Sequence, residues 1–314
     1  MRPLTVSLLA SLAALSLPAM APALSFQTRL EHSEWSVEGD KFECRLSQPV
    51  ANFGYGEFVR RAGEQVTFRL KSRERWLQPG SATLLAAAAP WRPGQGDINL
   101  GSVRVEGAEV PFNSSQEQGV RLLAGVLEGR SPVVRHRTPY GGDNLEVRLL
   151  PARFQKAYEQ YQECAAKLLP VNYDQIRQTQ LGFPGGGIEL EPRARAKIDI
   201  ILDFVKADPS INFYRLDGHS DNSGNRLSNR DLSRRRALTV KDYLISQGVP
   251  PEQIEVRFHG ETYPLVPNNS PQNRATNRRV TLTLDKLPVP ETESAAASSG
   301  AAPPPVQAKS DPKA

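Results

Sequence analysis

Hydrophobic and polar residues alternate in short runs through the first half of the chain, from about residue 26 to residue 151. Turn residues separate the runs, and glycines gather in NFGYGEF and RPGQGD, which read as corners. Period-two alternation with β-branched residues is typical of antiparallel strands. The pattern predicts an antiparallel β domain, a sandwich or a barrel, with the strands KFECRLS, QVTFRLKS, SVRVEGAEVPF, VRLLAGVLEG, SPVVRHR and NLEVRLLP.

A helical pattern follows over residues 152–168. One apolar stripe recurs there at helical spacing: Phe154, Tyr158, Tyr161, Ala165 and Leu168. Such a stripe is typical of a helix that packs on a core. Because Pro170 ends this helix, we place the N-terminal β domain at residues 24–169.

Strands and helices alternate from residue 170 onward. NYDQIRQ, INFYRLD, QIEVRFH and RRVTLTL read as strands, residues 191–207 and 226–246 as helices, and FPGGGIEL as a glycine-rich turn. The order β-α-β-α-β-β predicts a small α+β sandwich over residues 170–286, with two helices on one sheet face. Residues 287–314 are rich in Pro, Ala and Ser and are expected to be disordered.

Residues 1–23 have the features of a secretory signal peptide. Arg2 supplies the basic start, and the apolar run that follows is too short for a confident membrane span. Cleavage after residue 23 fits, and a cut after Ser25 fits nearly as well. No cysteine lies near the cut, so a lipid anchor is not expected there, and no later segment has the length of a transmembrane helix. We therefore expect a periplasmic protein, and export argues against nucleic acid as a partner despite the net charge of +5.

The chain has two cysteines, Cys44 and Cys164. In an oxidising compartment an even pair is interpreted first as one disulfide. It would close a loop of about 120 residues, and the lost entropy of the unfolded chain would stabilise the fold by about 4–5 kcal/mol. A bridge would fasten the 152–168 helix to the β domain; the alternative is two unrelated buried thiols.

Residues 218–237, GHSDNSGNRLSNRDLSRRRA, concentrate charge and polarity around one histidine. The four histidines of the chain show neither HxxH nor HExxH spacing, so a zinc site is not indicated. A calcium loop would need glycine where Arg226 stands and an acid where Leu232 stands. No GxSxG is present, and both cysteines lie outside this region. We predict no catalytic residues, no metal and no cofactor.

Helical spacing over residues 226–246 puts Asn229, Ser233 and Arg236 on the same face as the apolar residues. A guanidinium that points inward needs an acceptor or an anionic ligand. Asp221, at the end of the preceding strand, is the nearest acid. The two side chains could simply pair with each other. Alternatively, Asp221 could receive an ammonium while Arg236 holds a carboxylate, which would select a zwitterionic amino-acid centre.

The stretch GHSDNSGNRLSNRDLSRRRA and the later segment HGETYPLVPNNSPQNRATNRRV together resemble the peptidoglycan-binding domain of the OmpA family. The resemblance spans about residues 171–286. It implies that Asp221 and Arg236 hold the zwitterionic end of diaminopimelate in the peptide stem, with Asn229 and Leu232 as supports or stem contacts. Ser220 stands where the family usually has threonine and keeps the hydroxyl. Arg279 matches a position that helps to order the pocket.

The N-terminal half, with ECRLS followed by ANFGYGEF and a second cysteine near the domain boundary, resembles periplasmic components of the flagellar stator. This resemblance implies a bridge between Cys44 and Cys164, and attachment to basal-body and stator proteins. We expect a non-enzymatic anchor that links the stator to peptidoglycan and is required for torque. A cell-wall hydrolase would need a nucleophile or metal constellation that residues 26–168 do not supply. A general envelope-stability protein, not tied to the flagellum, is the remaining alternative.

Overall fold

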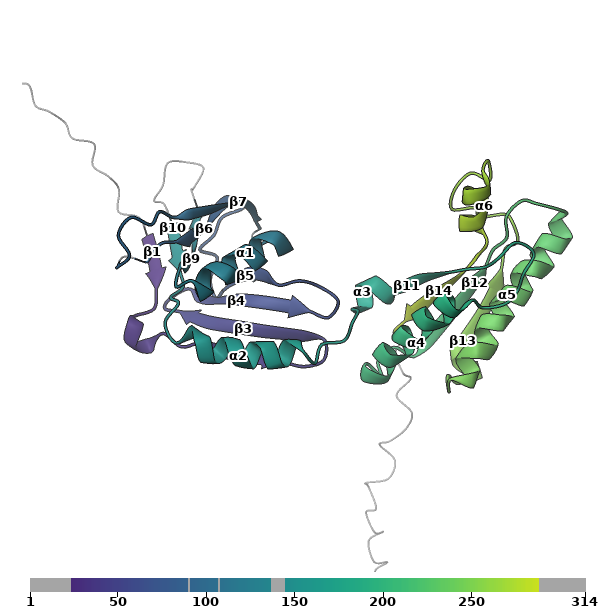
Figure 1. Cartoon of the computed structure of the whole chain (residues 1–314), viewed down its shortest axis with the longest axis horizontal. Helices are drawn as coiled ribbons and strands as arrows, with labels where there is room; N and C mark the ends of the chain where they lie inside the picture. The colour runs from purple at the N-terminus through teal and green to yellow at the C-terminus, as the bar shows by residue number, and fades with distance from the viewer. Residues whose placement is uncertain (1–23, 90, 107, 137–144, 288–314) are drawn as a thin grey trace, which may run out of the picture. The chain divides into compact units, whose positions relative to one another are not determined.

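The computed structural model describes residues 24–89, 91–106, 108–136 and 145–287. These residues form two compact units, one ending at Asn172 and the other beginning at Tyr173 (Figure 1). The predicted signal peptide, and all but the first residue of the predicted tail, lie outside the described residues. Within the described ranges no helix combines the length and the apolar character that a membrane span requires.

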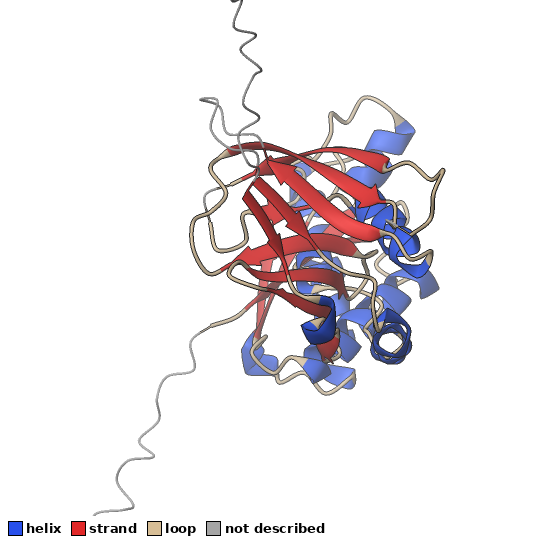
Figure 2. Cartoon of the chain, turned by 90° about the vertical axis from the view of Figure 1, so that its left-hand side faces the viewer, coloured by secondary structure: helices blue, strands red, loops and turns tan. Residues whose placement is uncertain are grey.

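The first unit is built on one curled ten-stranded sheet, whose curvature is visible in the red strands of Figure 2. The spatial order of its strands is β1-β10-β9-β6-β7-β8-β5-β4-β3-β2. Neighbouring strands pair antiparallel, except that β1 is parallel to β10. The strands are Leu24–Gln27 (β1), Ser36–Gly39 (β2), Glu43–Val50 (β3), Gly54–Arg61 (β4), Thr67–Ser72 (β5), Gly80–Ala87 (β6), Ile98–Val105 (β7), Phe112–Asn113 (β8), Ser131–His136 (β9) and Leu145–Arg148 (β10).

Side chains tie the two ends of this strand order together. Thr28, just after β1, donates its hydroxyl to the carbonyl of Pro49 in β3 at 2.8 Å. Gln48 in β3 donates to the carbonyl of Leu150 at 2.9 Å and accepts from its N–H at 2.8 Å. The curl encloses a core to which every second residue of β3 and β5 contributes, as the alternating burial of both strands shows. The expected sandwich or barrel is therefore a single sheet curled toward closure.

Two helices cover this sheet: Gln116–Leu127 (α1) packs on β5, β6, β7 and β9, and Phe154–Ala165 (α2) packs on β2 and β3. The prediction of a strand over VRLLAGVLEG is wrong, because α1 occupies most of it. A capping box between Ser115 and Gln118 starts the helix. Gly119 lets α1 approach the sheet closely, since a Cβ there would lie 2.4 Å from the carbonyl oxygen of Val66.

The corner predicted at NFGYGEF is also largely wrong, because β4 begins at Gly54. The turn is confined to the residues just before it, where Asn52 has a positive φ of 62°. Gly56 fits inside the strand because a Cβ there would lie 2.5 Å from a methyl group of Leu149. Glycine in this segment therefore permits close packing rather than a bend.

A disulfide joins Cys44 in β3 to Cys164 in α2, which confirms the predicted bridge. It fastens the helix to the sheet, and the buried side chains of α2 are Phe154, Ala157 and Tyr161. Gly39 in β2 makes room for the bridge, since a Cβ there would lie 2.6 Å from the sulfur of Cys164.

The second unit is a four-stranded sheet in the order β11-β14-β12-β13, in which only β12 and β13 pair parallel. Its long helices, α4 and α5, are neighbours: the Tyr243 hydroxyl of α5 donates to Asp199 of α4 at 2.7 Å. The strands are Gln178–Gly182 (β11), Phe213–Gly218 (β12), Ile254–Phe258 (β13) and Arg279–Asp285 (β14), and the helices are Tyr173–Ile176 (α3), Pro192–Ala207 (α4), Arg226–Ser246 (α5) and Pro271–Asn277 (α6).

The predicted β-α-β-α-β-β order is confirmed, with two differences at its ends. NYDQIRQ is not a strand: its first half forms α3, and β11 begins at Gln178. Helix α6 was not predicted; Ser270 caps it through the N–H of Asn273, and Pro271 occupies its first turn. This short helix leads directly into Arg278.

Candidate functional site

The 218–237 stretch connects the end of β12 to α5, at the edge where β13 ends and β14 begins. Backbone hydrogen bonds fix it there: His219 N–H donates to the carbonyl of Arg279 at 2.9 Å, and Ser220 N–H to that of Gly260 at 2.8 Å. Gly218 allows α5 to lie against β12, since a Cβ there would lie 2.2 Å from the carbonyl oxygen of Ser233. The strand end and the helix therefore meet with little room between them.

A compact turn separates this strand end from α5. The Asp221 carboxylate accepts the N–H of Ser223 at 2.9 Å, and Asn225 caps α5 by accepting the N–H groups of Leu227 and Ser228. Both are local side-chain to backbone bonds that favour a turn followed by a helix start. The Ser223 N–H occupies Oδ1 of Asp221, which leaves Oδ2 for a different partner.

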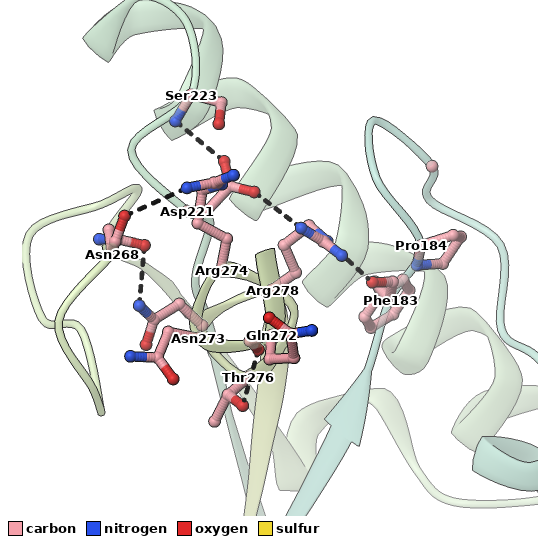
Figure 3. Close-up of polar contacts among 12 residues, drawn as sticks. Phe183, Pro184, Asp221, Ser223, Asn268, Gln272, Asn273, Arg274, Thr276 and Arg278 are labelled. Carbon is pink, nitrogen blue, oxygen red and sulfur yellow. Dashed lines mark hydrogen bonds and ion pairs between the residues drawn. The ribbon is translucent and has the colours of Figure 1, made fainter. Parts of the chain in front are cut away.

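That partner is Arg278, whose Nη1 lies 3.0 Å from Oδ2 of Asp221 (Figure 3). Arg278 also donates from Nε to the carbonyl of Phe183 at 3.3 Å. Burial alone would raise the pKa of Asp221, but the Ser223 N–H and the Arg278 guanidinium outweigh it and hold that pKa below its ordinary value. Asp221 is therefore a carboxylate at neutral pH.

Arg236 lies fully buried, with 0% of its surface exposed. Its guanidinium donates to three carbonyls: Gly187 at 2.9 Å, Pro184 at 2.9 Å and His219 at 3.4 Å. It also lies over the ring of Phe183, 5.5 Å from the centroid. The sequence left open whether Asp221 and Arg236 simply pair with each other. The structure does not have that pair: Arg236 donates to backbone carbonyls, and Asp221 pairs with Arg278.

The charges of the site nevertheless interact. Burial and, to a smaller extent, the charge of the nearby Arg278 lower the pKa of Arg236 to about 10, while Asp221 acts in the opposite direction. Arg236 stays a cation at neutral pH. One carboxylate and two guanidinium groups thus share the site, which leaves an excess of positive charge near Asp221.

The other predicted residues surround this centre with different roles. Asn229 is buried and donates to Glu261 at 2.6 Å. Leu232 is half-buried on the same helix. Ser220 is buried, and its hydroxyl has no hydrogen-bond partner among the described residues. Arg279 is buried and donates to the carbonyls of Asn277 and Tyr263 at 3.3 and 3.2 Å, so it holds the segment between β13 and β14 in place.

His219 takes no part in the ion pair. Its ring stacks on that of His259 at 5.0 Å, and His259 in turn lies 2.8 Å from Asp217. Burial, followed by the charge of Arg279, lowers the pKa of His219 to about 4, so the ring is neutral at neutral pH. Among the described residues no group of three histidine, cysteine or acidic side chains is arranged to hold a metal ion.

Sequence reasoning did not single out Arg278, Glu261 or the loop carbonyls. Arg278 stands inside the motif Asn277-Arg278-Arg279, so a signal was present, but only its neighbour Arg279 was assigned a role. The glycine-rich segment FPGGGIEL was interpreted as a turn. Nothing in its spacing predicts that Pro184 and Gly187 accept hydrogen bonds from Arg236, which lies 52 and 49 residues later, respectively.

Two domain families match the chain. The MotY N-terminal domain matches residues 26–170, and the OmpA family matches residues 182–278. The chain joins a MotY N-terminal domain to an OmpA domain. The OmpA domain contains Asp221, Arg236 and Arg278, so the candidate site lies within it.

Whole-chain and domain relatives agree with this division. The "Sodium-type flagellar protein MotY" of Vibrio parahaemolyticus is 26% identical over 82% of this chain and 89% of its own length. A "Peptidoglycan-associated lipoprotein" of Pseudomonas putida is 39% identical over 33% of this chain, and the match spans 61% of that relative. The "Peptidoglycan-binding protein ArfA" of Mycobacterium tuberculosis is 32% identical over 33% of this chain and 32% of its own length.

Among solved structures, the C-terminal domain of Helicobacter pylori MotB is 26% identical, with a TM-score of 0.32, and the match covers 34% of this chain and 84% of that one. The peptidoglycan-associated lipoprotein of Burkholderia pseudomallei is 23% identical, also with a TM-score of 0.32, and the match covers 34% and 89% of the two chains.

Proposed function

We propose that this protein is a periplasmic component of the flagellar motor that anchors the stator to the cell wall. Its OmpA domain binds peptidoglycan without covalent chemistry, through the diaminopimelate of the stem peptide, and its N-terminal domain associates with the basal body and stator proteins. The relative that is similar over most of both chains is named a flagellar protein, and relatives of the OmpA domain are named for peptidoglycan. Those names support an anchor rather than an enzyme.

The observation that carries the wall-binding proposal is the ionised Asp221 beside two guanidinium groups. Diaminopimelate in a stem that is not cross-linked offers an ammonium and a carboxylate on one carbon. A carboxylate and a guanidinium held side by side match that pair of charges. The lowered pKa of Asp221 keeps it available for an ammonium at neutral pH.

Arg236 supports the carboxylate end of such a ligand. Its five N–H donors exceed the three carbonyls it binds, so both terminal nitrogens keep one N–H. Because the side chain is fully buried, a ligand reaches it only if the segment Phe183–Gly187 moves. Asn229 and Leu232 lie on the same helix as supports, and Ser220 and Arg279 order the loops around the site.

Co-sedimentation with isolated peptidoglycan tests this function. The mature protein is expected in the pellet, and Asp221→Ala and Arg236→Ala are expected to leave it in the supernatant. Arg235→Ala is the matched control, since Arg235 lies on the same helix, is exposed and forms an ion pair with Asp231 at 2.9 Å, away from the site. Normal sedimentation of folded Asp221→Ala and Arg236→Ala variants would refute the wall site.

A deletion strain tests the cellular role. Cells that lack the protein are expected to assemble flagella but swim weakly, because the stator would have no fixed attachment. Loss of flagella, or lysis with normal motility among the survivors, would refute the motor role and favour a general envelope function.

A further inference from the structure

Arg278 is the guanidinium of the site that a ligand meets first. Its side chain is 19% exposed and that of Asp221 is 12% exposed, whereas Arg236 has no exposed surface. Figure 3 shows the Arg278 side chain lying between Asp221 and Phe183, with a dashed contact to each. A ligand that approaches Asp221 therefore meets the Arg278 ion pair before it meets Arg236.

The backbone of Arg278 is held firmly while its side chain is held lightly. The carbonyl of Arg278 accepts the Phe183 N–H at 2.9 Å, and its own N–H donates to the carbonyl of Arg274 at 3.0 Å. The preceding Asn277 is buried, and its amide bonds to the segment Leu265–Asn268 at 2.8–3.3 Å. Beyond this anchored backbone, the contacts of the guanidinium with described residues are one ion pair and one long hydrogen bond at 3.3 Å.

We propose that Arg278 is an exchangeable partner of Asp221: it neutralises that carboxylate in the free site, and when a ligand ammonium replaces it, the released guanidinium binds the carboxylate of the same ligand. This inference rests on the proposed function and deepens it. It assigns Arg278 as the residue that selects a zwitterion, a role that was not assigned from the sequence.

Charge balance explains the selection. A buried carboxylate without a partner is strongly unfavourable, and Arg278 removes that cost in the free protein. An amine without a carboxylate can displace Arg278 only by leaving its guanidinium unpaired near the cation Arg236. A carboxylate without an amine finds Asp221 already paired and gains no exchange. A zwitterion supplies both charges, so one ion pair is replaced by two.

Three ligands of the same carbon spacing separate these cases: meso-diaminopimelate, cadaverine, which keeps both amines and lacks both carboxylates, and pimelate, which keeps both carboxylates and lacks both amines. Calorimetric titration of the full mature chain would compare the wild type with Arg278→Gln. Arg235→Gln removes the same charge from an exposed position and serves as the control.

Loss of a charge-assisted contact is expected to weaken diaminopimelate binding about tenfold to a hundredfold in Arg278→Gln. The same variant is expected to bind cadaverine more tightly than the wild type, because the internal competitor for Asp221 is gone. Pimelate is expected to bind neither protein measurably. A structural defect would weaken the binding of diaminopimelate and of cadaverine together. Weaker diaminopimelate binding with tighter cadaverine binding therefore indicates the exchange itself. Arg278→Lys, which keeps the charge, is expected to fall between wild type and Arg278→Gln for both.

Unchanged diaminopimelate binding in Arg278→Gln, or a change of the same sign for diaminopimelate and cadaverine, would overturn the exchange. If the wild type binds diaminopimelate and Asp221→Ala abolishes this, the wall site stands even when the exchange fails. If the wild type binds neither diaminopimelate nor peptidoglycan, the proposed function fails and the exchange falls with it.

Discussion

Replacing Arg236 separates its structural role from its role in binding. Arg236→Met keeps an unbranched stem but removes all three donors to Gly187, Pro184 and His219. Hydrogen bonds from a charged donor contribute about 1.5–3 kcal/mol each, so the gross loss is about 4.5–9 kcal/mol. Part of this is offset because a buried charge is removed, and because the exposed Pro184 and half-buried Gly187 can turn to water. We expect a net loss of about 2–4 kcal/mol.

The distribution of tryptophan makes this measurable in the intact chain. All three tryptophans, Trp35, Trp76 and Trp91, lie in the first unit. The longest helices, α4 and α5, with 16 and 21 residues, lie in the second. In a urea titration, tryptophan fluorescence therefore follows the first unit and far-ultraviolet circular dichroism follows mainly the second.

We expect the dichroism midpoint of Arg236→Met to fall by about 1–2 M urea while the fluorescence midpoint stays in place. Arg236→Lys should fall less, because an ammonium keeps the charge but cannot match three carbonyls with a planar fork. Arg235→Met is the control on the same helix. An unchanged dichroism midpoint in Arg236→Met, or an equal fall of both midpoints, would refute the reasoning.

Three further predictions use the same two signals. Replacing Cys44 and Cys164 by serine should lower the stability of the first unit alone by about 4–5 kcal/mol, given a sequence separation of 120, and an unmoved fluorescence midpoint would contradict this. The pKa of Asp221 is held below its ordinary value of 3.8, so its ionised form stabilises the fold above that pH and this contribution is lost as pH falls through the lower folded value. Asp221→Asn should therefore lower the dichroism midpoint at pH 7, and its difference from the wild type should shrink as the pH is lowered below 3.8; a difference that does not change with pH would count against it. Gly218→Ala should strongly destabilise the second unit because its Cβ would meet the backbone of α5 at 2.2 Å, whereas Gly182→Ala, with no neighbour within 4 Å, is the control; equal midpoints would show that α5 can shift.

The sequence predicted those parts of the fold that local pattern determines. In the second unit, the alternating residues of β12, β13 and β14 and the apolar faces of α4 and α5 were sufficient to predict these five elements and their order, whereas α3 and α6 were not predicted. VRLLAGVLEG was misread because a short apolar run fits a strand or a helix equally well, and the deciding signal was the Ser115–Gln118 capping box upstream. The near closure of the first sheet could not be predicted, since it depends on Gln48 and Leu150, which are 102 residues apart.

The candidate site shows the same division. Asp221 and Arg236 were found because one closely follows a strand and the other lies on the inward face of a helix, and the family resemblance pointed to both. Their actual partners were not found, because they come from elsewhere in the sequence: Arg278 is 57 residues from Asp221, and Gly187 is 49 from Arg236. A helical wheel predicts which residue points inward, but not which carbonyl or guanidinium meets it.

The disulfide also determines how a mechanical load passes through the molecule. In the proposed role as an anchor between the flagellar motor and the cell wall, the protein is pulled from both ends, and tension from the second unit enters the first at Asn172. Its side chain donates to the carbonyl of Ala62 at 3.1 Å, and Leu169 donates to that of Lys41 at 2.9 Å. Next back along the chain is α2, which could otherwise peel from the sheet one turn at a time. The covalent bond from Cys164 to Cys44 lies at the last turn of that helix, so the pull passes directly into β3 without first unwinding α2.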